Sequence, residues 1–111
     1  MKVAVIGSRS LHLPDLAAYL PSDTSEIVSG GACGVDTDAA EYARLHGLRL
    51  TEFRPDYDTF GHAAPLLRNL QIIDYCDIVL AFWDGHSRGT AFVIDHCRRL
   101  HKPLRVFRKT A

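Results

Sequence analysis

The sequence predicts an α/β protein of Rossmann-like, three-layer architecture, in which a five-stranded, mostly parallel sheet carries helices on both faces. Five short apolar runs alternate along the chain with segments of helical periodicity. Glycine-containing polar loops follow three of these runs. The composition, 47% hydrophobic and 23% charged over 111 residues, suits a single packed domain over residues 1–111.

The first half of the chain supplies three strands and two helices, over residues 3–6, 13–21, 26–29, 35–47 and 48–55. The first two strands are short apolar runs that glycine brings to an end. The first helix is expected because Pro14 suits a first helical turn and Pro21 stops the helix. In the second helix, Asp36 or Thr37 is the expected N-cap and Gly47 the expected end. The third strand alternates apolar and polar residues, as a half-buried strand does.

The second half supplies a loop, two helices and two strands, over residues 56–62, 62–76, 77–83, 87–102 and 103–108. In the first of these helices, Leu66, Leu70 and Ile73 share one stripe. The fourth strand is apolar throughout, which predicts a central position in the sheet. Ser87 or Thr90 is the expected cap of the last helix, which a proline stops before the final strand.

Strands that alternate with helices form parallel sheets, and we expect the common strand order 3-2-1-4-5. Ligands of such sheets bind at the carboxyl ends of the strands, near the topological switch point. The polar loops stand at these ends: GSRS at 7–10, GGACGVD at 30–36 and WDGHSRGT at 83–90. The sequence therefore predicts one cleft that all three loops line.

The three loops have the chemistry of an anion site. Their glycines let backbone N–H groups approach a ligand closely, and two of the loops lead into helix N-termini, which favour negative charge. Arg9, Arg68 and Arg88 are candidate cations. The full set of candidate ligand-binding residues is Gly7, Ser8, Arg9, Ser29, Gly30, Gly31, Ala32, Gly34, Asp36, Arg68, Asn69, Trp83, Asp84, Ser87, Arg88, Gly89 and Thr90.

Several of these residues have a second interpretation. The glycines are equally typical of turns, and Arg68 is also compatible with a surface ion pair. Trp83 is either a core residue or a surface on which a base or ribose stacks. Asp36 is most simply a helix cap, and Asp84 a turn residue, although Asp84 also suits ribose hydroxyls or general-base work. Cys33 precedes a helix but has no adjacent histidine, which disfavours a nucleophilic role.

Charge and cysteine content argue against several classes of protein. Thirteen basic residues balance thirteen acidic ones, so no long-range attraction to nucleic acid or anionic membrane is expected. Three widely spaced cysteines and scattered histidines predict neither a disulfide framework nor a metal site. Without an apolar stretch of transmembrane length or a signal peptide, we expect a cytoplasmic protein that does not bind membranes.

The loops together resemble the SLOG superfamily, which groups Smf/DprA-like and LOG-like Rossmannoid proteins, and within it the small YspA- and YpsA-related branch. The resemblance rests on GSRS at 7–10, SGGACGVD at 29–36, RN at 68–69 and FWDGHSRGT at 82–90. It implies binding of a nucleotide or nucleotide derivative, such as a nucleoside monophosphate or an ADP-ribose- or NAD-like molecule, in a sensor role and with no required cofactor. It also implies self-association, because relatives are often dimers.

Two groups of relatives provide competing hypotheses. LOG enzymes release the base from a nucleoside monophosphate and carry the motif P-G-G-x-G-T-x-x-E. Here GHSRGTAFV keeps Gly89 and Thr90 but has Val93 at the glutamate position. An enzyme that cleaves an N-glycosidic bond is therefore the alternative hypothesis, with Asp84 or Asp36 as its acid/base group. DprA-like proteins have a similar S-G-G-A-x-G-[IV]-D loop and bind single-stranded DNA, which makes nucleic-acid binding the weaker alternative.

Overall fold

The five predicted strands form one all-parallel sheet in the order β3-β2-β1-β4-β5, as the sequence predicts. A computed structural model describes residues 1–110 of the chain. The strands are β1 (Lys2–Gly7), β2 (Glu26–Ser29), β3 (Arg49–Glu52), β4 (Ile78–Trp83) and β5 (Leu104–Arg108). The helical elements are η1 (Leu16–Ala18), α1 (Val35–Leu45), α2 (Tyr57–Phe60), η2 (Gly61–Ala63), α3 (Ala64–Tyr75) and α4 (Arg88–Arg99).

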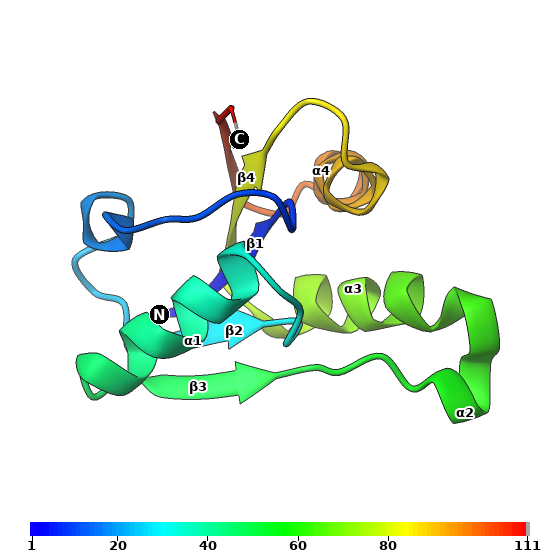
Figure 1. The fold of residues 1–111 in the computed structure, drawn as a ribbon, viewed down its shortest axis with the longest axis horizontal. Coiled ribbons are helices and arrows are strands. Elements are labelled where there is room, and N and C mark those ends of the chain that lie inside the picture. Colours follow the sequence, from blue (N-terminus) through cyan, green and yellow to red (C-terminus); the bar gives the residue numbers. More distant parts are fainter. Residues whose placement is uncertain (111) are drawn as a thin grey trace.

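Helices cover both faces of the sheet, which confirms the three-layer prediction (Figure 1). Successive residues of a strand point to opposite faces, and β1 divides its apolar side chains accordingly. Val3 and Val5 pack on the side that holds η1 and α1. Ala4 and Ile6 pack on the side that holds α3 and α4. β1 and β4 therefore lie buried on both faces at the centre of the sheet.

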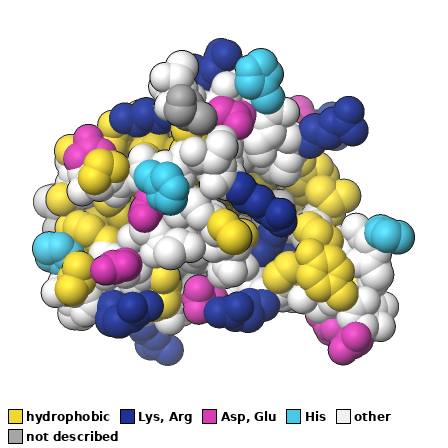
Figure 2. All heavy atoms as spheres, viewed as in Figure 1, with side chains coloured by type: hydrophobic (Ala, Val, Ile, Leu, Met, Phe, Trp, Pro, Cys, Tyr) yellow, Lys and Arg dark blue, Asp and Glu magenta, His cyan; other side chains and the backbone are white. Residues whose placement is uncertain are grey.

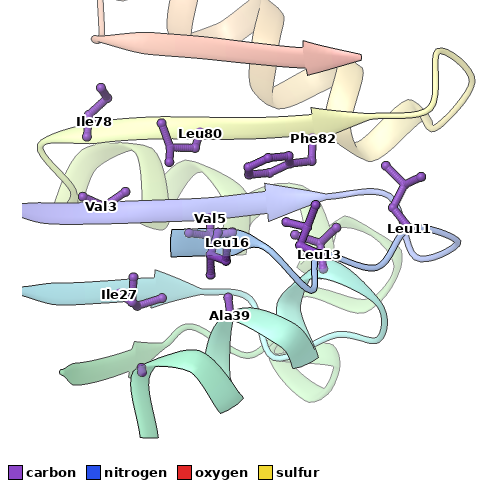
Figure 3. Close-up of a cluster of buried hydrophobic side chains, with 12 residues drawn as sticks. Val3, Val5, Leu11, Leu13, Leu16, Ile27, Ala39, Ile78, Leu80 and Phe82 are labelled. Carbon is purple, nitrogen blue, oxygen red and sulfur yellow. The ribbon is translucent and has the colours of Figure 1, made fainter. Parts of the chain in front are cut away.

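The segment between β1 and β2 consists mostly of turns, and the prediction of a helix over residues 13–21 is wrong. A single 3-10 turn forms there, at Leu16–Ala18, and Asp15 makes no capping hydrogen bond with its side chain. Leu11, Leu13 and Leu16 are all buried against one face of the sheet (Figure 3). The spacing of two and then three residues follows neither a strand nor a helix throughout, which agrees with a segment built mainly of turns.

The ends of α1 and α2 also differ from the sequence expectation. Gly34 is the N-cap of α1, so Asp36 and Thr37 lie within the helix and neither caps it. Residues 56–62 are not a plain loop, because they contain α2. Asp56 caps that short helix by accepting a hydrogen bond from the backbone N–H of Thr59, at 3.2 Å.

α3 begins at Ala64, two residues later than expected, with a proline in its first turn. Of the predicted stripe, Ile73 is buried, whereas Leu66 is exposed and Leu70 is half-buried. The residues that α3 buries are instead Ala64, Asn69, Ile72 and Ile73. The buried face of α3 is therefore rotated about the helix axis relative to the predicted stripe, and Leu66 lies on the exposed side.

Candidate functional site

A cleft of about 450 Å³ opens at the carboxyl ends of β1, β2 and β4. The chain leaves β1 toward β2 and β3, and later returns to β4 and β5 on the other side of β1, so the cleft lies at the switch point of the sheet. One wall comes from α3. The lining residues are Ile6, Gly7, Ser8, Arg9, Ser10, Gly30, Ala32, Asp36, Pro65, Leu66, Arg68, Asn69, Ile72, Asp84, Ser87, Gly89 and Thr90.

The structure brings most of the predicted site residues together in this cleft. All three strand-end loops contribute, and so does the Arg-Asn pair of α3. The predicted residues that line the cleft are Gly7, Ser8, Arg9, Gly30, Ala32, Asp36, Arg68, Asn69, Asp84, Ser87, Gly89 and Thr90. The predicted residues outside the lining are Ser29, Gly31, Gly34, Trp83 and Arg88.

The loop after β2 is held by its own residues. The Oδ2 atom of Asp36 accepts a hydrogen bond from the backbone N–H of Ala32, at 3.0 Å. The hydroxyl of Ser29 accepts one from the N–H of Gly31, at 3.3 Å. Gly34 has a φ of 68°, and a Cβ added there would lie 2.4 Å from the backbone oxygen of Arg9. Only glycine fits this position, because the loops after β1 and β2 touch there.

Arg68 connects α3 to the same loop. Its Nη1 atom donates a hydrogen bond to the backbone oxygen of Gly30, at 2.6 Å. Its Nε atom donates one to Oδ1 of Asn69, at 2.9 Å. Arg68 is half-buried, and burial is the main reason why the pKa of its guanidinium is lowered, with the neighbouring Arg9 acting in the same direction and Asp36 against it.

Asp84 organises the loop after β4. Its Oδ1 atom accepts hydrogen bonds from the backbone N–H groups of His86 and Ser87, both at 2.8 Å. Its Oδ2 atom accepts one from the hydroxyl of Ser10, at 3.3 Å. The two backbone donors, followed by the serine hydroxyls of the β1 loop, lower the pKa of Asp84 to about 2. Asp84 is therefore a carboxylate at neutral pH and joins the first and third loops.

Asp36 differs from Asp84 in its surroundings. It is buried, and burial raises the pKa of its carboxyl group above the ordinary value, although the Ala32 N–H and the Arg68 guanidinium act in the opposite direction. Its oxygen is already engaged by the loop. The sequence expectation of a helix cap is thus replaced by a contact that closes the turn before the helix.

Trp83 was expected to contact a base or ribose, and the structure places it outside the cleft lining. Its indole N–H donates a hydrogen bond to the backbone oxygen of Ser87, at 3.0 Å. The guanidinium of Arg108 lies over its ring, 5.7 Å from the centroid. The ring therefore packs against the end of β5. Arg88, the first residue of α4, is exposed and also lies outside the lining.

Five residues that line the cleft are not among the site residues predicted from the sequence. Ser10 belongs to the quoted GSRS motif and was within reach of that signal. The other four are apolar: Ile6, Pro65, Leu66 and Ile72. Three of them come from α3 and stand beside the Arg-Asn motif, but only the three-dimensional position of α3 shows that they form a wall.

Val93, at the position of the LOG-type glutamate, is fully buried in the core between α4 and the sheet. Its side chain contributes to packing and not to the cleft lining. In the described part of the chain, no helix has both the length and the apolar character needed to cross a membrane. Among residues 1–110, no group of three His, Cys, Asp or Glu side chains is placed to hold a metal ion.

Comparisons with family models, curated proteins and solved structures found no match to this chain.

Proposed function

We propose that the protein binds a nucleotide or a nucleotide derivative in the cleft, with the phosphate held between the loop after β2 and the N-terminus of α4. The observation that carries this proposal is the meeting of two guanidinium groups with two helix N-termini around one hollow. Arg9 and Arg68 both line the cleft, and neither forms an ion pair within residues 1–110. Burial disfavours the charged form of Arg68, Asp36 favours it and Arg9 adds a smaller repulsion, and a bound anion would favour the charged form further.

The N-terminus of α4 supports a phosphate position. The first backbone N–H groups of an α-helix have no partner within the helix, and the helix dipole adds a partial positive charge there. Gly89 and Thr90 belong to this first turn and line the cleft. A Cβ added to Gly89 would meet no atom within 4 Å, so open space adjoins the backbone at this point.

A nucleotide fits the remaining surfaces better than inorganic phosphate alone. Pro65, Leu66 and Ile72 form an apolar wall of the cleft. These side chains cannot hydrogen-bond a small anion, but they can pack against the less polar part of a larger ligand. Ser10 and Asp84 offer oxygen atoms that suit sugar hydroxyls. A volume of about 450 Å³ also lies within the ordinary range of small-molecule sites.

The carboxylates of the cleft favour binding over hydrolysis. General acid–base catalysis works best when the pKa of the catalytic group lies near the working pH. The pKa of Asp84, lowered to about 2, makes it a poor proton acceptor and leaves it no proton to give at neutral pH. Burial raises the pKa of Asp36, but its Oδ2 atom accepts a hydrogen bond from the backbone N–H of Ala32, which gives this carboxyl group a structural role in the loop. We therefore propose a binding protein, possessing a sensor role, in preference to a glycosidic hydrolase.

Isothermal titration calorimetry with inorganic phosphate, ribose 5-phosphate, AMP, ADP-ribose and NAD tests the proposal. The informative variant is Arg9→Ala, because Arg9 is exposed and its loss leaves no known structural contact unmade. We expect phosphate-bearing ligands to bind about 1.5–3 kcal/mol more weakly, the scale of a hydrogen bond to a charged group. Arg44→Ala removes the same charge from the far end of α1 and is the matched control. Equal affinities in all three proteins would sink the proposal.

The hydrolase alternative is tested in the same samples. Each nucleotide is incubated with the protein, and the products are separated by chromatography. Binding without release of free base supports the proposed role. Release of base that disappears in Asp84→Asn would replace it with the enzymatic one.

A further inference from the structure

Two aromatic side chains stand exposed on α2, the short helix that precedes α3. The side chains of Tyr57 and Phe60 are 56% and 48% exposed, and no residue of α2 is buried. Residues three apart on a helical turn share a face, so the two rings belong to one surface. Leu66 follows in the first turn of α3 and is 42% exposed. The three side chains together form an apolar patch, which we call the α2 patch.

The α2 patch continues into the cleft. Leu66 belongs to both, because it lines the cleft together with its neighbour Pro65. Tyr57 lies close enough to Arg68 for its hydroxyl to act on the pKa of the guanidinium. Figure 2 shows Lys and Arg side chains near the centre of this face of the molecule, with hydrophobic side chains beside them toward the end that carries α2. The patch therefore adjoins the cationic part of the cleft.

The backbone of α2 presents the rings in a defined turn. Asp56 accepts hydrogen bonds at both its side chain and its backbone oxygen, from the N–H groups of Thr59 and Phe60. Gly61 ends the helix with a φ of 55°, which side chains other than hydrogen rarely allow. The rings thus stay on the surface because the local turn directs them there, while the fold gains little from them.

We propose that Tyr57 and Phe60 form the platform on which the base of the cleft-bound nucleotide stacks. The inference rests on the proposed function, since a base stacks on α2 in this way only when the nucleotide occupies the cleft. Aromatic side chains accept any planar base, because every base has a flat face on which a ring can stack. This arrangement orients the ligand, with its phosphate toward the loop after β2 and its base toward α2. It also gives the base a contact that Trp83, packed against Arg108, does not provide.

Comparison of AMP with ribose 5-phosphate tests the platform, because the two ligands differ only in the base and the hydroxyl it replaces. We expect the wild-type protein to bind AMP about tenfold or more tightly than ribose 5-phosphate, the scale of one stacked base. Tyr57→Ala and Phe60→Ala should each reduce this preference and leave the affinity for ribose 5-phosphate unchanged. Tyr57→Phe keeps the ring and should keep the preference. Leu100→Ala removes a comparably exposed apolar side chain at the end of α4 and should change neither affinity.

The outcomes separate the platform from the function on which it rests. Equal binding of AMP and ribose 5-phosphate to the wild type, or equal weakening of both by Tyr57→Ala, would overturn the platform alone. Binding of neither ligand would overturn the proposed function and the platform together. A second copy of the chain is the other molecule that could occupy the α2 patch, and sedimentation velocity tests for such a dimer. A dimer that Phe60→Ala dissociates would assign the α2 patch to self-association and overturn the proposal.

Discussion

The guanidinium of Arg68, on α3, donates a hydrogen bond of 2.6 Å to the backbone oxygen of Gly30, in the loop after β2. This contact joins two segments that are 38 residues apart in the sequence. A guanidinium has five N–H donors, and the hydrogen bonds to Gly30 and Asn69 use two of its nitrogen atoms. The remaining donors stay available to a ligand. Arg68 thus fixes one wall of the cleft and can also bind an anion within it.

Gly30→Ala should displace Arg68 with little loss of fold stability. A Cβ at this position would lie 2.5 Å from Nη1 of Arg68, and 3.1 Å from Oδ2 of Asp36. The first of these atoms ends a flexible side chain and can move away. We expect the free energy of unfolding, from urea titration, to fall by about 1.5 kcal/mol, the lower end of the range for a hydrogen bond to a charged group. The affinity for phosphate-bearing ligands should fall at the same time, and an unchanged affinity would contradict the role of Arg68.

Gly34→Ala should instead weaken the fold itself. Its φ of 68° is strained for any side chain, and its Cβ would lie 2.4 Å from the backbone oxygen of Arg9, which cannot move alone. Strained backbone of this kind costs about 1–3 kcal/mol, and the clash adds to that cost. Urea titration of both variants compares the loss of unfolding free energy in Gly34→Ala with that in Gly30→Ala. A smaller loss of stability for Gly34→Ala than for Gly30→Ala would show that the contact between the two loops is misassigned.

Gly89→Ala should weaken ligand binding without lowering the stability of the fold. Glycine within a helix is less stable than alanine by about 0.5–1 kcal/mol, and the added methyl group meets no atom within 4 Å. The variant should therefore unfold at an equal or higher urea concentration. Because the methyl group narrows the space beside the proposed phosphate position, titration calorimetry should show weaker binding of AMP. Weaker folding, or tighter binding, would contradict this assignment of the space at the start of α4.

The parallel sheet was predictable from the sequence, and its observed strand order is the common one that was assumed, whereas several details of the site were not predictable. Alternating apolar runs and helical segments indicated the architecture, because parallel strands need long crossover connections, which are usually helices, although the connection between β1 and β2 holds only a 3-10 turn. The direction of Trp83 was not predictable, since its ring packs against Arg108 of a strand that lies beside it only in the folded sheet. The hydrogen bond from Arg68 to Gly30 was also not predictable. Its acceptor is a backbone oxygen, and every residue has one, so the sequence does not indicate which backbone oxygen Arg68 contacts. α2 has only four residues, too few to show helical periodicity.

Asp84 should make folding stability depend on pH in the acid range. Its pKa is about 2 in the folded protein against an ordinary value of 3.8, so the unfolded chain binds more protons between these two values. Stability contributed by Asp84 is therefore present above pH 3.8 and is lost as the pH falls toward 2. Urea midpoints measured at several pH values should fall more steeply for the wild type than for Asp84→Asn. Parallel curves would show that the hydrogen bonds of Asp84 to His86 and Ser87 do not form in solution.

Val93→Glu places a glutamate where the LOG motif has one and should nevertheless produce no hydrolase. Val93 is 0% exposed and packs in the core between α4 and the sheet, so a glutamate there would place an unpaired carboxylate among apolar side chains. Burial of an unpaired charge costs several kcal/mol, and we expect a large fall in the urea midpoint or a failure to fold. Val106→Glu is the matched control, since Val106 is exposed on β5 and should tolerate the charge. If Val93→Glu folds normally and releases base from AMP, the glutamate reaches the cleft, and the orientation of α4 described above is wrong.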